Sequence, residues 1–270
     1  MSVSTPGRLG SNASFVLALF ARQLAASFAL RAAFITAAVA MLINDAMFFS
    51  TWWIVMRRFG SVRGWHIEDV MCLFGVSAGG FGICVILFGG IFDLARKVQD
   101  GELDTYLTQP KSVLLSALAC RTQPSGWGDL VAAIGMFALS GTVTWGRLPW
   151  LVLALLCSAV AYTATGVVMH SIAFWLGRVH SLARSLWDFT VTFSLYPPPL
   201  FGGALRVVLF TLVPAGLVAY LPLEMLRAPS PSTVLVALGG TALYAAFALW
   251  LFDRGTRRYS SGNRMVTGAS

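Results

Sequence analysis

The sequence has 270 residues, of which 57% are hydrophobic and only 11% charged, and its mean hydropathy is +0.75. These values exclude an ordinary soluble domain, in which about a quarter of the residues are charged, and indicate an integral membrane protein. The formal net charge of +8 comes almost wholly from arginine. In such a chain it points to loops that face anionic lipid headgroups rather than to nucleic acid.

Residues 13–31 are expected to form an amphipathic helix at the membrane surface, because Arg22 and Arg31 interrupt their apolar run. The following runs are continuous and do not alternate with period two, so helices rather than a barrel are expected to cross the membrane. Each is long enough for roughly 30 Å of hydrocarbon. The six predicted spans cover about 32–56, 69–93, 127–145, 149–176, 203–223 and 232–252. The expected fold is an all-α integral membrane protein with one transmembrane domain over residues 1–270.

Arginine and lysine predict the orientation through the positive-inside rule. If the N-terminus is cytoplasmic, the inner segments carry thirteen of these residues and the outer segments five, with Arg206 near a span end left out. Both termini are therefore predicted to be cytoplasmic.

Asn44 and Asp45 lie near the middle of the first predicted span. An ionisable group there costs ~2.5 to 3.5 kcal/mol on insertion scales. One interpretation is that the two residues line a translocation path or a dimer interface. The other is that the span begins earlier, which would put Asp45 close to the outer membrane interface.

Glycines dominate the second predicted span, and small residues spaced four apart let helix backbones approach closely. The pattern involves Gly75, Gly79 and Gly82. Close packing inside the chain is one interpretation, and contact with a second permease is the other.

The hairpin at residues 94–125, between the second and third spans, holds the stretch "VQDGELDTYLTQP" with three of the eleven carboxylates. It is predicted to contain a short helix with Asp100 as N-cap, acidic residues in the first turn, and Pro110 at its end. One face is apolar, formed by Leu103, Tyr106 and Leu107. Contact with lipid headgroups is one role for this face. Because a cytoplasmic leaflet repels anions, a protein partner with a basic groove suits the acids better.

Residues 177–202 are predicted not to form a further span. Arg178, Arg184 and Asp188 interrupt the segment, and three consecutive prolines end it. A short interfacial helix leading into a kinked entry to the fifth span is expected. Whether residues 181–195 form a second cytoplasmic docking helix stays open.

Three stretches together resemble the ABC-2 permeases, the membrane subunits of ATP-binding cassette exporters of the second type. They are "LARKVQDGELDTYLTQPKS" at 94–112, "YPPPLFGGALRVVLFTLVPAGLVAYLP" at 196–222 and "FDRGTRRYSSGN" at 252–263. In such permeases the loop after the second span carries a coupling helix that docks on the ATPase. Carried over by position, the resemblance implies that this contact comprises Gly101, Glu102, Leu103, Asp104, Leu107 and Pro110, with Tyr106 on the same stripe.

The resemblance also implies the partners. They are an ATP-binding cassette ATPase subunit, a second permease that is identical or a sister chain, membrane lipids and an exported substrate that the sequence does not identify. No nucleic acid is expected. The implied location is the plasma (inner) membrane of a bacterium.

The chain lacks a phosphate-binding loop, since its Lys111–Ser112 pair follows Pro110 where the motif needs glycine. No cofactor is therefore expected in this chain, and ATP and Mg would bind the partner ATPase. No histidine has a metal-ligand partner at the required spacing, so neither a metal site nor an enzyme activity of its own is expected. Two alternatives remain: a proton-coupled secondary transporter, suggested by Asp45, and a non-transporting membrane scaffold.

Overall fold

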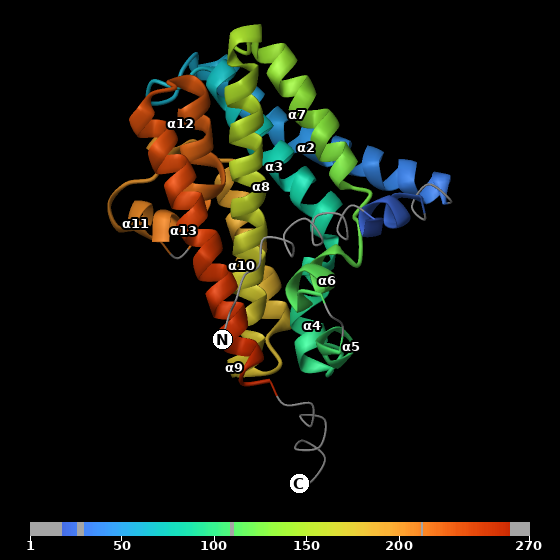
Figure 1. Ribbon diagram of the computed structural model, residues 1–270. Coiled ribbons are helices and arrows are strands. Elements are labelled where there is room, and N and C mark those ends of the chain that lie inside the picture. The colour runs from blue at the N-terminus through green and yellow to red at the C-terminus, as the bar shows by residue number, and fades with distance from the viewer. Residues whose placement is uncertain (1–17, 26–29, 109–110, 212, 260–270) are drawn as a thin grey trace.

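The computed structural model describes residues 18–25, 30–108, 111–211 and 213–259 (Figure 1). Within these ranges the chain is helical, apart from one isolated bridge between Val62 and Trp65, which confirms the predicted all-α fold. Four helical stretches are long and apolar enough to cross a membrane: Arg31–Phe59, Ile67–Gln99, Trp145–Leu176 and Pro231–Thr256. A shorter apolar helix covers Gly126–Ser140. This is the architecture of a multi-pass membrane protein. Of the predicted surface helix, residues 18–25 are described and helical.

The first predicted span corresponds to α2 (Arg31–Phe59), and the second to a rod made of α3 (Ile67–Phe88), the 3-10 helix η1 (Gly89–Asp93) and α4 (Leu94–Gln99). The rod tightens at η1, where Gly89 and Gly90 lie against backbone carbonyls of residues 117–121. A Cβ on Gly89 would lie 2.9 Å from the Arg121 carbonyl oxygen. The close approach therefore requires glycine at this point.

The rod packs between α7 (Gly126–Ser140) and α8 (Leu148–Ser171), the elements that correspond to the third and fourth predicted spans. The glycines singled out in the sequence face these two helices. A Cβ on Gly75 would lie 2.6 Å from the Phe137 ring, and one on Gly79 would lie 2.6 Å from Leu155 Cδ2. A Cβ on Gly82 would lie 2.7 Å from the Gly126 carbonyl oxygen. The structure thus places all three in packing within the chain.

Residues 177–202 differ from the expected interfacial helix. After the short α9 (Ala173–Leu176), α10 (His180–Ser194) runs antiparallel to α8 and buries Trp187, Thr190 and Ser194. The Ser194 hydroxyl forms hydrogen bonds with the Ser77 hydroxyl at 2.7 Å and with the Tyr162 hydroxyl at 2.8 Å. Since Ser77 lies within α3 and Tyr162 within α8, one face of α10 packs against the helix bundle, while Arg184 and Asp188 lie on its exposed face.

The predicted span 203–223 is not one continuous helix. It is divided into α11 (Gly203–Thr211), a π-helical turn η4 (Gly216–Tyr220) and α12 (Leu221–Arg227). Pro214 lies at the break and cannot donate a backbone hydrogen bond. α12 is held to the start of α3 by the Arg227 guanidinium, which lies 2.7 Å from the Asp69 carboxylate. The last helix, α13 (Pro231–Thr256), corresponds to the sixth predicted span and is capped by Ser230.

The close contact of α3 with α7 gives a testable expectation. Gly82→Ala places a methyl group against the Gly126 carbonyl oxygen, whereas a Cβ on Gly135 of α7 meets nothing within 4 Å. We expect Gly82→Ala to destabilise the protein by about 1 to 3 kcal/mol, as overpacking does. Gly135→Ala should leave stability unchanged or raise it slightly. Melting temperatures in one detergent compare the two, and equal values would contradict the packing described here.

Candidate coupling site

The acidic stretch lies at one end of the molecule, where α4, α9 and the end of α13 gather (Figure 1). Asp100 is not an N-cap here, because it ends α4 and donates its backbone N–H to the Arg96 carbonyl oxygen at 2.8 Å. Gly101 follows with φ of 76°, and Glu102 donates its N–H to the Lys97 carbonyl oxygen. This pattern is a Schellman C-cap, in which glycine supplies the left-handed residue. The stretch therefore begins as the end of a helix.

The predicted short helix is reduced to one turn, α5 (Asp104–Leu107). Its apolar stripe is divided: Leu103 is fully buried, Tyr106 is half-buried and Leu107 is 47% exposed. The outward face of this region presents Glu102, Thr105, Leu107 and Thr108. Pro110 lies outside the described residues. The surface available to a partner is therefore small, and it combines one carboxylate, hydroxyls and one leucine.

A buried lysine ties α4 to α6 (Val113–Ala119). Lys97 is only 6% exposed, and its ammonium donates to the Ala117 carbonyl oxygen at 3.0 Å and to Cys120 Sγ at 2.8 Å. The same ammonium lies 5.4 Å from the centre of the Tyr106 ring, within the range of a cation–π contact. Burial raises the pKa of the Tyr106 hydroxyl, which keeps the ring neutral. Lys97 thus holds both α5 and α6 against the end of the rod.

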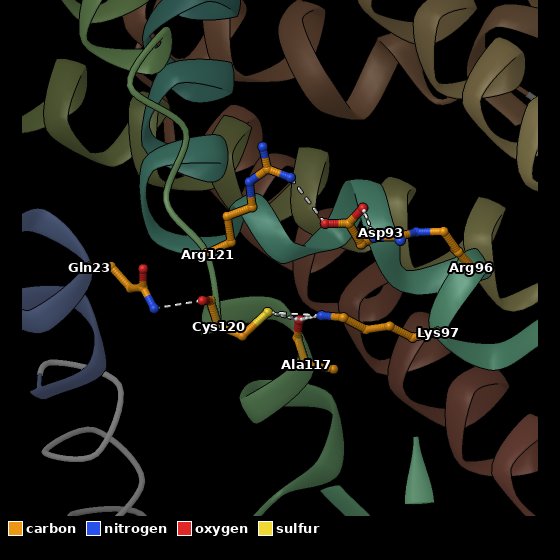
Figure 2. A network of polar contacts seen from close by, with 7 residues as sticks. All are labelled: Gln23, Asp93, Arg96, Lys97, Ala117, Cys120 and Arg121. Carbon is orange, nitrogen blue, oxygen red and sulfur yellow. Dashed lines mark hydrogen bonds and ion pairs between the residues drawn. The ribbon is translucent and has the colours of Figure 1, made fainter. Parts of the chain in front are cut away.

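Four further side chains complete this anchor network, which comprises Gln23, Asp93, Arg96, Lys97, Ala117, Cys120 and Arg121 (Figure 2). Figure 2 shows the Asp93 carboxylate between two guanidinium groups, at 2.8 Å from Arg96 and 3.3 Å from Arg121. Gln23 donates its amide N–H to the Cys120 carbonyl oxygen at 2.7 Å. The N-terminal helical residues, η1, α4 and the end of α6 are therefore joined at one place.

The opposite side of the acidic stretch contacts the last helices. Gln99 donates its amide N–H to the Gly177 carbonyl oxygen at 2.8 Å, which joins α4 to the turn before α10. Tyr259, just after α13, lies near Gly101, and its ring packs edge-on against Phe174 of α9. Burial and, second, the neighbouring Asp104 carboxylate raise the pKa of Tyr259 to about 12. Its hydroxyl therefore stays protonated at physiological pH. The acidic stretch is thus joined to the turn before α10 and lies next to the residue that follows the last turns of α13.

The other residues singled out in the sequence lie elsewhere. α2 begins at Arg31, so Asp45 is the middle residue of this helix of 29 residues and not near its end. Asp45 is buried, and its Oδ2 has no hydrogen-bond partner among the described residues, whereas its neighbour Asn44 is exposed. The structure thus buries one of the two side chains and exposes the other, whereas the sequence analysis assigned both residues the same possible roles.

Sequence reasoning missed Asp129, a second carboxylate inside the helical bundle. It lies on α7, is 2% exposed, and also leaves Oδ2 without a partner. Its helix, α7, packs against α2, which carries Asp45. Its place inside the predicted span 127–145 was the available signal. Two helices in contact, α2 and α7, therefore each carry a buried carboxyl group.

In the described part of the chain, no group of three or more histidine, cysteine, aspartate or glutamate side chains is placed to hold a metal ion. Residues 42–262 match the family model described as "ABC-2 family transporter protein". No curated protein and no solved structure matches the chain.

Proposed function

Because this chain belongs to the ABC-2 family of transporter proteins, we propose that it is the membrane permease of an ATP-driven export complex, with ATP and Mg bound by a separate ATPase chain. The region from Gly101 to Thr108 docks on that ATPase at the cytoplasmic side. A second permease, identical or a sister chain, completes the translocation path. The complex lies in the plasma membrane of a bacterium, with both termini of the permease in the cytoplasm.

The observation that best supports this proposal is that the acidic stretch contacts the helix bundle on its inner side, while its outward face is exposed. Lys97 holds it to α6, Gln99 to the turn before α10, and Tyr259 lies between it and α13. A surface loop that only rested on lipid headgroups would not need a buried ammonium beneath it, because burying a charge is costly. Rigid support of a small exposed face suits the transmission of force.

The support also indicates how movement would spread. α4 continues through η1 into α3, so a push on α5 acts along one rod of helix that packs on both α7 and α8. ATP binding would bring the two ATPases together and shift the permeases between inward-open and outward-open states. Packed helices have discrete arrangements and do not deform continuously, which favours such switching.

The docking proposal is tested by changing only the outward face. Glu102→Lys combined with Leu107→Glu alters two exposed side chains and should leave the melting temperature within about 1 °C, as surface substitutions do. In its native host, a tagged chain with both changes should lose the co-purifying ATP-binding cassette ATPase, measured by mass spectrometry and by ATP hydrolysis of the eluate.

Glu68→Lys is the matched control, because Glu68 is also an exposed carboxylate and lies in the first turn of α3, away from the acidic stretch. It should retain the ATPase. Recovery of the ATPase with the double variant, or its loss with Glu68→Lys, would remove the docking role from residues 101–108.

A proton-coupled secondary transporter is a second candidate, favoured by the buried carboxyl groups of Asp45 and Asp129. Two such groups from neighbouring helices are the kind of arrangement through which membrane transporters move protons. Transport by the reconstituted complex separates the candidates. Export that needs ATP and the ATPase, and is unchanged when the pH gradient is collapsed, supports the first candidate and contradicts the second.

A further inference from the structure

A groove lies at the other end of the molecule, between α2 and the proline-rich segment after α10. Its volume is about 290 Å³. Its walls are aromatic and aliphatic, formed by Phe48, Trp52 and Val55 of α2 together with Val62, Tyr196 and Leu200. The Trp52 and Tyr196 rings meet edge to face, with their centres 5.7 Å apart. We name this cavity the aromatic groove.

The lining of the aromatic groove favours an apolar ligand. Six of its seven lining residues are aromatic or aliphatic, and the seventh is Thr51. An apolar chain suits such a surface.

Two arginines lie close in sequence to residues that line the aromatic groove. Thr51, Val55 and Arg58 follow at i, i+4 and i+7 on α2, so Arg58 extends the same helix face that forms the wall. Arg63 follows Val62, and its guanidinium donates to the Pro199 carbonyl oxygen at 2.7 Å, next to Leu200 of the opposite wall. In the described chain neither arginine has a carboxylate within ion-pairing distance.

The backbone at Arg63 adds a second observation. Arg63 has φ of 50°, the only positive φ of a non-glycine residue in the described ranges, and Gly64 follows at 82°. With the Val62–Trp65 bridge this is a tight hairpin turn in which glycine, asparagine or aspartate is usual at the first position. This conformation is unfavourable for arginine. The turn nevertheless carries a cation and positions it at the groove.

We propose that the aromatic groove binds one acyl chain of an anionic lipid from the surrounding bilayer, with the lipid phosphate on Arg58 and Arg63. The apolar lining accounts for the chain, and two guanidinium groups without a carboxylate partner in the described chain account for the negative headgroup. The end of a membrane helix is also where headgroups lie. This site is separate from the acidic stretch, and its occupancy does not depend on an ATPase.

The test uses the purified full chain in detergent and native mass spectrometry, with phosphatidylglycerol and phosphatidylcholine of the same acyl chains. We expect phosphatidylglycerol to bind at least about tenfold more tightly, the size of one charge-assisted contact. Arg58→Gln should abolish this preference, and since Arg58 has no hydrogen-bond or ion-pair partner recorded in the described chain, folding should be unaffected.

Arg147→Gln is the control, because it removes the same charge from an exposed arginine outside the groove. It should keep the preference. Leu200→Trp fills the groove and should weaken the binding of both lipids by a similar factor. Equal binding of the two lipids, a preference that survives Arg58→Gln, or full displacement of phosphatidylglycerol by inorganic phosphate would each overturn the proposal.

Discussion

Replacing Trp187 by alanine is expected to cost about 3 to 5 kcal/mol of the free energy of unfolding, the range for a large aromatic side chain removed from a core. Trp187 is 1% exposed, and its ring centre lies within 6.5 Å of those of Phe81, Phe92, Tyr162 and His170. It also faces Gly166 of α8, where no Cβ would fit. The neighbours belong to α3, η1 and α8, and they cannot close a cavity of this size without moving helices.

The effect should appear as a fall of roughly 10 °C in melting temperature and as lower recovery from detergent. Trp145→Ala is the control, since Trp145 is 89% exposed and its removal should change the melting temperature little. The comparison tests the position of α10. If α10 were a surface helix, as the sequence suggests, the two variants would behave alike.

Replacing Lys97 by glutamate is expected to release the acidic stretch from the bundle. The substitution places a carboxylate where an ammonium now donates to the Ala117 carbonyl oxygen, so two acceptors would face each other in a buried site. Breaking a buried charge contact in this way costs about 3 to 5 kcal/mol. We expect proteolysis within residues 99–125 to become faster and the co-purifying ATPase to be lost.

Lys97→Met separates charge from shape, because methionine keeps most of the apolar stem and brings no unpaired charge. Its cost should be about 1 kcal/mol, close to that of one hydrogen bond. The readouts are the melting temperature and the rate of proteolytic cleavage. Equal losses for glutamate and methionine would mean that the lysine acts through its bulk and not through the contacts of its ammonium group.

The elements predicted best are those whose residues are apolar in a continuous run. Four helices begin and end within a few residues of a predicted span: α2, α3, α8 and α13. A continuous run of about 20 apolar residues crosses a membrane as a helix, because a helix satisfies its own backbone hydrogen bonds. The acidic stretch was also located correctly as a separate feature between α3 and α7. Its helix was not, since Gly101 ends α4 in a left-handed conformation that the pattern of acids alone does not reveal.

A helix was expected in the region of α10, but the burial of one of its faces was not, for a different reason. Arg184 and Asp188 pair on its exposed face while Trp187 and Ser194 are buried on the other, so the average hydropathy of the segment resembles that of a surface helix. The hydrogen bonds of Ser194 with Ser77 and Tyr162, which are distant in the sequence, show that the other face of α10 is buried against α3 and α8. The aromatic groove is likewise invisible in the sequence, because its two walls are more than 130 residues apart along the chain.

The sequence by itself determined that this chain is a helical membrane protein, where most of its long helices lie, and which stretch departs from the apolar pattern. Those properties follow from local composition, which bilayer hydrocarbon selects segment by segment. The tertiary structure alone decided which charges are buried, that Lys97 and Asp129 lie inside while Glu102 and Arg58 face outward, and which glycines touch which helix. These outcomes depend on contacts between residues distant in sequence, and no local pattern encodes them.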